Sequence, residues 1–198
     1  YVGATGRPAG NVADMDNTGL EIELGYRQKF GKVNFSANGN VTFIKNNVTY
    51  VGLGKTFIAG YASFQSMGMV SIIKPGMPFN TFYGYQTDGI FQNWDEVNAY
   101  KNSTGGLVQP KAQPGDFRWK DMDGNGLIDE NDKVNLGNSL PKTTFGLTLN
   151  ADYKGFDIMV FTQGATGNKI FQGLRRLDVG NSNYQTKALS RWTGEGTS

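Results

Sequence analysis

The stretch GLEIELGYRQKFGKVNFSANGNVTF, residues 19–43, decides the fold. Its first half alternates apolar and polar residues with a period of two, which is the spacing of the two faces of a β-strand. The apolar members are Leu20, Ile22, Leu24 and Tyr26, and the polar members are Glu21, Glu23, Gly25 and Arg27. We therefore predict a strand that has one apolar face and one strongly polar face.

The second half of the same stretch repeats the alternation after a short turn near Gly31. From Val33 to Phe43, every second residue is apolar or small, and the residues between them are Asn, Ser or Thr. Two alternating runs separated by a glycine turn predict a β-hairpin of long strands with a tight connection.

A second hairpin is predicted near the end of the chain. Residues 143–153 (TTFGLTLNADY) alternate in the same way, and the turn YKG at 153–155 leads into FDIMVFTQG at 156–164. Between the two hairpins, residues 63–73 and 79–91 are weaker strand candidates, joined by a turn at KPGMP, residues 74–78.

Long strands with short turns at one end and long loops at the other are typical of an outer-membrane β-barrel. If Gly31 marks a short periplasmic turn, the turns at 74–78 and 153–155 fall on the same side. Residues 46–64 and 92–141 then become outer loops. We expect an all-β fold, an antiparallel transmembrane β-barrel segment with long extracellular loops. A soluble β-sandwich, whose strands also alternate, remains the alternative.

Composition excludes several classes of function. The chain has neither cysteine nor histidine, which excludes disulfides, thiol catalysis, a Ser-His-Asp triad and most transition-metal sites. A net charge of +2 without a Lys/Arg cluster argues against a nucleic-acid partner. No apolar run approaches the length of a transmembrane helix. Both ends read as cuts through a longer protein, so we expect a fragment.

The segment DMDGNGLIDENDK, residues 121–133, has the spacing of an EF-hand type calcium loop. The mapped ligands are Asp121, Asp123, Asn125, the carbonyl of Leu127, Asp129 and Asp132, with Gly126 at the turn. Calcium takes six to eight oxygen ligands, and alternate side chains of a tight loop converge on one point. The twelfth ligand is Asp rather than the usual Glu. The hypothesis is a structural calcium site, and the alternative is a solvated turn rich in Asp, Asn and Gly.

Aromatic residues are the candidates for substrate binding, because aromatic rings stack on sugars. They are Tyr83, Tyr85, Trp94 and Trp119. The alternative for each is an interfacial aromatic girdle or ordinary loop packing. Asp88, Asp95 and Glu96 lie near aromatics, and a carboxylate pair of a surface glycosidase is a third alternative. Loop carboxylates are usually solvated and no histidine accompanies them, so we do not expect an enzyme.

The sequence resembles the barrel of SusC/RagA-type TonB-dependent outer-membrane transporters from about residue 10 to the end. The resemblance is carried by GMPFNTFYGYQTDGIFQNWDEV (residues 76–97), by AQPGDFRWKDMDGNGLIDENDKVNLGNSLPKTTFGLTLNADYKGFDIMVFTQGATGNKIF (residues 112–171), and by the strand start NTGLE (residues 17–21). The shared motifs occur in the order Gly84-Tyr85, Asp88-Gly89-Ile90-Phe91, Pro114-Gly115-Asp116, Gly137-Asn138, Pro141-Lys142, Gly155-Phe156-Asp157 and Arg191-Trp192.

This resemblance implies a role in nutrient uptake across the outer membrane of a Gram-negative bacterium. Residues 1–198 would be part of a TonB-dependent receptor β-barrel surrounded by outer-membrane lipid, with 92–141 as a long extracellular loop. The transporter would import oligosaccharides or peptides with a SusD-like surface lipoprotein, and TonB would act through a plug region that this chain lacks. The alternative from another class is a secreted, calcium-stapled, carbohydrate-binding β-sandwich module.

Overall fold

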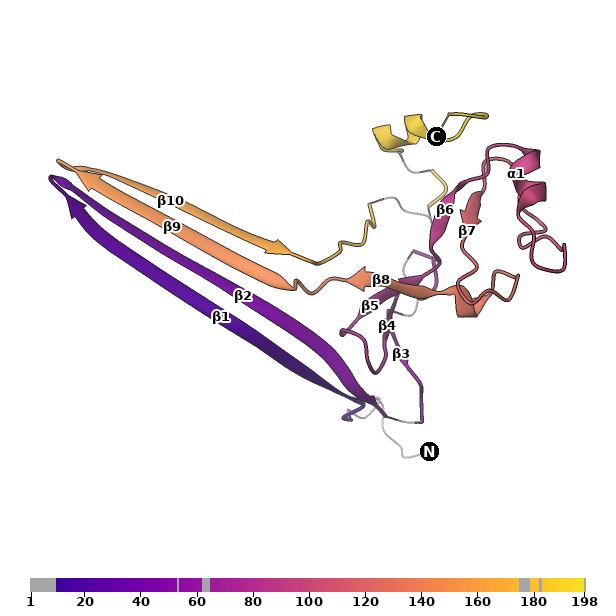
Figure 1. The fold of residues 1–198 in the computed structure, drawn as a ribbon, viewed down its shortest axis with the longest axis horizontal. Coiled ribbons are helices and arrows are strands. Elements are labelled where there is room, and N and C mark those ends of the chain that lie inside the picture. Colours follow the sequence, from indigo (N-terminus) through magenta and orange to yellow (C-terminus); the bar gives the residue numbers. More distant parts are fainter. Residues whose placement is uncertain (1–9, 53, 62–64, 175–178, 182, 198) are drawn as a thin grey trace. The chain divides into compact units, whose positions relative to one another are not determined.

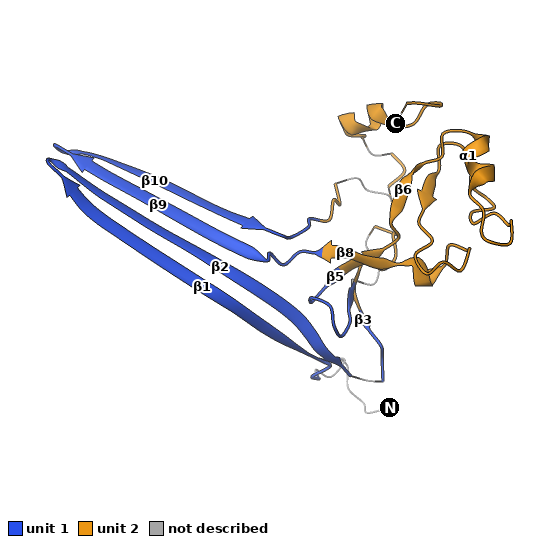
Figure 2. Cartoon of the chain, in the orientation of Figure 1, with its two compact units in different colours: residues 1–58, 72–81, 138–170 blue, residues 59–71, 82–137, 171–198 orange. Residues whose placement is uncertain are grey.

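A computed structural model describes residues 10–52, 54–61, 65–174, 179–181 and 183–197. The chain divides into two compact units, coloured in Figure 2. Unit 1 comprises residues 1–58, 72–81 and 138–170, and unit 2 comprises residues 59–71, 82–137 and 171–198. Each unit is described by itself.

Unit 1 is built on a four-stranded antiparallel sheet with the strand order β1-β2-β9-β10 (Figure 1). Its strands are β1 (Ala13–Phe30), β2 (Val33–Val51), β9 (Thr143–Tyr153) and β10 (Phe156–Thr166). Gly31 and Gly155 adopt positive φ angles of 62° and 88° in the two hairpin turns, a conformation that glycine reaches without steric cost. Both predicted hairpins are confirmed.

The two hairpins are direct neighbours, because β2 pairs with β9 from Val33 opposite Tyr153 to Phe43 opposite Thr143. The prediction of two further strands of the same sheet at 63–73 and 79–91 is wrong. These segments contain only the short strands β4 (Ser71–Ile73), β5 (Thr81–Gly84) and β6 (Thr87–Ile90), and residues 63 and 64 lie outside the described residues. The segments are interrupted before β5 at Asn80, with a φ of 57°, and the pairing of β6 with β7 is irregular around Gly89, with a φ of 97°.

The predicted position of the turn at 74–78 is also wrong. The sequence predicted it on the same side as the Gly31 turn, but it lies at the opposite end of unit 1. The N–H of Gly76 donates to the carbonyl of Val48, and the N–H of Val48 donates to the carbonyl of Met77, both at 2.9 Å. Val48 lies near the end of β2 that is remote from Gly31. Residues 52–142 therefore form one continuous connection between the far ends of β2 and β9, and the segment 92–141 is its later part.

One face of the long sheet is apolar across all four strands. The register aligns Leu24 of β1 with Gly39 of β2, Leu147 of β9 and Thr162 of β10, and the residues two positions away in either direction continue the face. Its apolar members on β1, β9 and β10 include Leu20, Ile22, Leu24, Tyr26, Phe145, Leu147, Phe156, Ile158 and Val160, all of which are exposed. Leu24 is 72% exposed and Ile158 67% exposed, so no hydrophobic core covers this face within the described residues.

The opposite face of the sheet is polar and hydrogen-bonded between strands over most of β1, β2 and β9, whereas β10 contributes the exposed apolar side chains of Met159 and Phe161 to it. The Nδ2 of Asn34 donates to the Asp152 carboxylate at 2.7 Å, and the Nδ2 of Asn150 donates to the Ser36 hydroxyl at 3.3 Å. An apolar outer face and a polar inner face are what the wall of an outer-membrane barrel requires. Among the described residues, no helix has the length and apolar character needed to cross a bilayer.

The rest of the connection forms small elements. A second sheet has the order β3-β4-β5-β8, with β3 at Ile58–Tyr61 and β8 at Val134–Asn138. In unit 2, β6 pairs with β7 (Phe117–Trp119), and helix α1 spans Trp94–Ala99. The remaining elements are two 3₁₀ turns at Glu130–Asp132 and Thr186–Ser190. The core of unit 2 is small and consists of Phe91, Val97 and Ala112 with Tyr100 packed against them.

Candidate functional site

Three carboxylates of the predicted calcium loop come together in unit 2. Asp121, Asp123 and Asp132 each offer an oxygen, and these oxygens lie within 4.8 Å of one another. Asp121 and Asp123 enter the loop directly after β7, and Asp132 ends the 3₁₀ turn on the far side of the loop. Carboxylate oxygens at this separation are a donor set that suits a hard cation such as calcium.

Asp132 is fully buried, and backbone N–H groups orient its carboxylate. Oδ1 accepts from the N–H of Met122 and Oδ2 accepts from the N–H of Asp129, both at 2.7 Å. Burial alone raises the pKa of this carboxyl, but the hydrogen bonds from Asp129, Met122 and Asp123 outweigh burial, so the pKa lies below its ordinary value. Asp132 is therefore ionised at neutral pH inside the loop.

The other predicted ligands shape the turn. The Nδ2 of Asn125 donates to Asp123 at 3.1 Å and to Asp129 at 3.2 Å, and its Oδ1 accepts from the N–H of Leu127 at 2.8 Å. Asp129 also caps the 3₁₀ turn, where its carboxylate accepts from the N–H of Asn131 at 2.7 Å. Asn125 and Asp129 are thus joined to the carboxylate cluster by hydrogen bonds.

Glycine is required at position 126 on two counts. Its φ of 81° lies in the left-handed region, and a Cβ atom would sit 2.5 Å from Cβ of Asn102. The N–H of Gly126 donates to the carboxylate of Asp121 at 2.8 Å. The loop therefore closes tightly over Asp121 while Asn102 packs against its turn.

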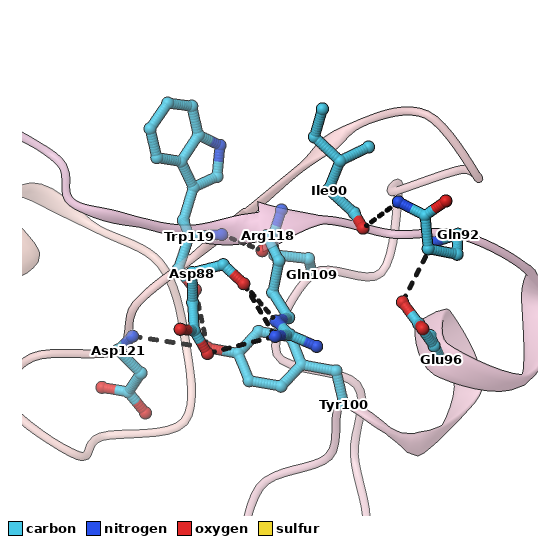
Figure 3. Close-up of polar contacts among 9 residues, drawn as sticks. All are labelled: Asp88, Ile90, Gln92, Glu96, Tyr100, Gln109, Arg118, Trp119 and Asp121. Atoms are coloured by element: carbon cyan, nitrogen blue, oxygen red, sulfur yellow. Dashed lines mark hydrogen bonds and ion pairs between the residues drawn. The ribbon is translucent and has the colours of Figure 1, made fainter. Parts of the chain in front are cut away.

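Tyr100 connects this loop to the core of unit 2 (Figure 3). Its hydroxyl donates to the carbonyl of Trp119 at 2.7 Å and accepts from the N–H of Asp121 at 3.4 Å. The ring packs against Phe91 with centroids 5.9 Å apart, and burial raises the pKa of the Tyr100 hydroxyl. The backbone of Asp121, which carries the first carboxylate of the cluster, is therefore hydrogen-bonded to a partly buried aromatic residue.

Two of the four predicted substrate-binding aromatics come together. The rings of Tyr85 and Trp119 have centroids 5.7 Å apart, and the ammonium group of Lys133 lies 5.2 Å from the Tyr85 centroid. Burial raises the pKa of the Tyr85 hydroxyl. Within the part of the chain that the structure describes, the ring contacts of this pair do not extend to Tyr83 on β5 or to Trp94, the first residue of α1.

Sequence reasoning missed Phe117. Its ring lies 5.5 Å from the Trp119 ring, measured between centroids, and its side chain is 53% exposed. The signal was present, because Phe117 and Trp119 flank Arg118 at strand spacing and therefore share one face of β7. This face borders a shallow depression of about 530 Å³, whose apolar lining includes Val108, Ala112 and Ile128.

Comparison with solved structures shows that the fold is similar to part of a peptide transporter. No family model matches the chain. Among solved structures, the RagAB peptide transporter is similar with a TM-score of 0.55 and 21% identity over 79% of this chain and 16% of that chain. The RagAB peptide importer in its closed-closed state gives a TM-score of 0.56, also at 21% identity, over 80% of this chain and 16% of that chain. The fold of this chain is therefore that of an antiparallel segment of these transporters, and the sheets formed by the described residues do not close on themselves.

Two curated relatives are similar to this chain over most of its length. TonB-dependent receptor P3 of Formosa agariphila is 26% identical over 94% of this chain, and TonB-dependent receptor P26 of the same species is 26% identical over 93% of it. This chain spans 18% of the length of each relative. The resemblance to SusC/RagA-type TonB-dependent transporters is confirmed, and the chain corresponds to a fragment of one. The matched proteins are named as receptors or transporters.

Proposed function

We propose that this chain forms part of the wall and the outer connection of a TonB-dependent transporter in the outer membrane of a Gram-negative bacterium. The observation that carries the proposal is the long sheet of unit 1, which exposes an apolar face on one side and a mainly polar, hydrogen-bonded face on the other. Lipid would cover the apolar face, and the polar face would line the barrel interior.

The β-sandwich alternative is less well supported by the same sheet. A sandwich buries the apolar faces of its sheets against each other. Leu24 and Ile158, from the two outer strands of this sheet, are both largely exposed. A secreted carbohydrate-binding module would leave this area in water, where it would promote aggregation.

The face assignment can be tested by thiol labelling, because residues 1–198 contain no cysteine and any cysteine elsewhere in the full-length protein can first be replaced by serine. Leu147→Cys and Thr148→Cys place a thiol on the apolar and the polar face of β9, one residue apart. In the full-length protein in outer-membrane vesicles, a membrane-soluble maleimide should label the Leu147→Cys variant preferentially. A charged, water-soluble maleimide should instead label the Thr148→Cys variant. Ready labelling of the Leu147→Cys variant by the charged reagent, or recovery of the full-length protein in the soluble fraction, would contradict the barrel assignment.

The transported substrate and the partners are finer parts of the same proposal. The transporter would import oligosaccharides or peptides, a SusD-like lipoprotein would cover its mouth, and TonB would act through the plug region. The similarity to RagAB, which is named a peptide transporter, supports transport and, of the two substrate classes, peptides. An affinity tag on the full-length transporter should recover a surface lipoprotein from detergent-solubilised outer membrane. Purification of the transporter without such a protein would count against the partner.

For the loop at 121–132, we propose a structural calcium ion. The clustered oxygens of Asp121, Asp123 and Asp132, and the ionised state of buried Asp132, support a hard cation in this position. Asn125, Asp129 and the carbonyl of Leu127 would supply further oxygens. Bound calcium would brace a loop whose hydrophobic core is small.

Calorimetric titration with calcium tests the metal directly. The full-length protein should bind calcium, and Asp121→Asn and Asp123→Asn should each weaken binding by at least tenfold. Glu130→Gln is the matched control, because Glu130 lies on the same loop but is paired with Lys133 at 2.7 Å. Equal calcium affinity in the wild type and both Asp variants would remove this loop as the metal site.

A further inference from the structure

Residues 1–198 contain two Asn-Gly pairs, at 38–39 and at 125–126, and the two lie in different surroundings. Asparagine before glycine tends to lose its side-chain amide, because the next backbone nitrogen can attack the side-chain carbonyl carbon and glycine has no side chain to obstruct it. The ring that forms includes the bond between Cα and the backbone carbonyl carbon of the asparagine, so this bond must rotate out of the extended conformation. The two pairs therefore allow a comparison within one chain.

The pair at 38–39 lies in the middle of β2, where strands on both sides hold it extended. Asn38 is opposite Gly25 of β1 and Thr148 of β9. Its side-chain oxygen leans toward β1, since a Cβ atom on Gly25 would lie 3.0 Å from it. Rotation of the Asn38 backbone would break the pairing with both neighbours, so ring closure is blocked at this pair.

The pair at 125–126 lies in the acidic loop, outside the strands and helices. Asn125 is exposed, and Gly126 has a φ of 81°. The N–H of Leu127 donates to Oδ1 of Asn125 at 2.8 Å, which folds the Asn125 side chain back along its own backbone. The same hydrogen bond draws electrons from the side-chain carbonyl carbon. The carbon to be attacked is therefore both turned toward the following peptide and made more reactive.

A carboxylate faces the proton that the attacking nitrogen must lose. The N–H of Gly126 donates to Oδ2 of Asp121 at 2.8 Å, a separation at which a side chain can act as a general base. The nitrogen that leaves is Nδ2 of Asn125, which donates to Asp123 at 3.1 Å and to Asp129 at 3.2 Å. The loop thus supplies a base for the attacking nitrogen, and the exposed side chain gives the leaving nitrogen access to water.

We propose that Asn125 is a site of spontaneous deamidation. The Gly126 nitrogen forms a bond to Cγ of Asn125, and its proton passes to Asp121. The bond between Cγ and Nδ2 then breaks as Nδ2 takes up a proton and leaves as ammonia. Water from the solvent adds to one of the two carbonyl carbons of the cyclic imide and opens it. Opening at Cγ gives aspartate, and opening at the backbone carbonyl carbon gives isoaspartate, whose peptide bond runs through the side chain.

Deamidation would change the acidic loop, and calcium would control its rate. Either product places a new negative charge beside the clustered carboxylates of Asp121, Asp123 and Asp132, and isoaspartate also lengthens the backbone of a tight turn. The control by calcium rests on the proposed metal site, whereas the reaction itself does not. With calcium bound, Asn125 and Asp121 would be ligands, so the side-chain carbonyl would be held in place and the base would be occupied.

The test uses the full-length transporter in detergent, kept for several days with a calcium chelator. After proteolysis, mass spectrometry compares the peptides that contain Asn125 and Asn38. The Asn125 peptide should gain the mass difference between an amide and a carboxylic acid, and isoaspartyl methyltransferase should label it, while the Asn38 peptide stays unchanged. After unfolding in urea, both peptides should convert, because β2 no longer protects Asn38. Absence of conversion at Asn125 in the folded protein, or equal conversion at both sites, would overturn the proposal.

Variants of the loop test the role of each group. Asp121→Asn should slow conversion at Asn125 by about tenfold or more, because the base is lost. Glu130→Gln is the matched control, because Glu130 lies on the same loop but pairs with Lys133, and it should convert like the wild type. Asn125→Gln keeps an amide but needs a larger ring, so it should show no conversion. An unchanged Asn38 peptide shows that the sheet is intact in each variant. Conversion of Asp121→Asn at the wild-type rate would overturn the role of Asp121.

A calcium arm separates this proposal from the proposed metal and transport functions. Excess calcium in place of the chelator should slow conversion of the wild type at Asn125. An equal rate with calcium and chelator would overturn the control by calcium and leave deamidation standing. Recovery of the same protein in the outer membrane reports on the barrel independently, so failure of deamidation and failure of the proposed function are distinguishable.

Discussion

The indole ring of Trp192 occupies the space that a side chain at residue 115 would fill. A Cβ atom on Gly115 would lie 2.7 Å from Cε3 of Trp192, and Gly115 has a φ of 96°. Two hydrogen bonds join the same segments, from Nδ2 of Asn93 to the Glu195 carboxylate and from the N–H of Gly196 to Gln92 at 2.9 Å. Residues 192–196, which follow β10, therefore pack against and hydrogen-bond to residues 92–115, which precede β7 in unit 2.

Replacing Gly115 by alanine should loosen this attachment. The new methyl group meets the Trp192 ring, which costs about 1–3 kcal/mol, in addition to the strain of a positive φ. Gly105→Ala is the matched control, because its φ of 86° carries the same strain but its Cβ meets nothing within 4 Å. Hydrogen exchange in the full-length protein should show lost protection at residues 91–97 and 191–197 for Gly115→Ala only. Equal loss in both variants would mean that the Trp192 contact does not hold the segments together.

A positive charge on the apolar face of β9 should destabilise the protein far more than one on its polar face. Leu149 pairs with Ala37 and Val160 on the apolar face, and Thr148 pairs with Asn38 on the polar face. Leu149→Arg should lower the free energy of unfolding by about 2–4 kcal/mol, because lipid does not solvate the charge, and Thr148→Arg should have a much smaller effect. Urea unfolding of the full-length protein in lipid vesicles measures both. Similar unfolding midpoints for the two variants would rule out lipid on the Leu149 side.

Gln109 should stabilise unit 2 although it lies in a loop, because its side chain makes two hydrogen bonds to the backbone of β7. Gln109→Ala leaves the N–H of Trp119 and the carbonyl of Phe117 without their side-chain partner, which should cost about 1–2 kcal/mol. Gln113→Ala is the control, because the Gln113 side chain is exposed. Hydrogen exchange at the Trp119 amide should accelerate in the Gln109 variant. Unchanged exchange at that amide would show that the Gln109 side chain does not close the strand edge.

The loop around Asp132 should lose stability only in acid. The pKa of the Asp132 carboxyl is lowered from the ordinary value of 3.8, so this carboxyl binds a proton at a higher pH in the unfolded loop than in the folded one. The stabilising contribution is therefore fully present above the ordinary value and is lost as the pH falls through the lowered pKa. Trp119 fluorescence, in variants that lack the other tryptophans, should report opening of the loop below about pH 4. Asp132→Asn should remove this transition, and a transition that persists in this variant would assign the acid sensitivity to another group.

The alternation of residues was sufficient to predict the hairpins. Glu21 and Glu23 cannot share a face with Leu20 and Ile22 in a β-strand, and Gly31 supplies the turn. The same reasoning failed at 63–73 and 79–91, where apolar residues are frequent but their period is broken by Gly68 and Gly84. The larger error concerned which strands are neighbours. Period-two alternation does not reveal the neighbour of a strand, and β2 pairs with β9 although residues 52–142 separate them in the sequence.

The loop and the aromatic site were predictable to different degrees. Asp121, Asp123 and Asp132 were assigned from local spacing, which a tight turn converts directly into proximity. Trp119 was selected by residue type and Tyr85 with it, but Phe117 was not selected, and Trp94 lies on a separate helix. Contacts between residues of different strands depend on packing, which residue type alone does not reveal.

By itself, the sequence determined the amphipathic strands, the glycine turns and the acidic loop, because each depends on neighbours within a few positions. Only the tertiary structure decided that β2 and β9 are adjacent, that Trp192 packs on Gly115, and that Gln109 closes the edge of β7. These contacts join residues that no local alternation or spacing links. Their formation depends on hydrogen-bond registry and steric fit in three dimensions, which no local pattern encodes.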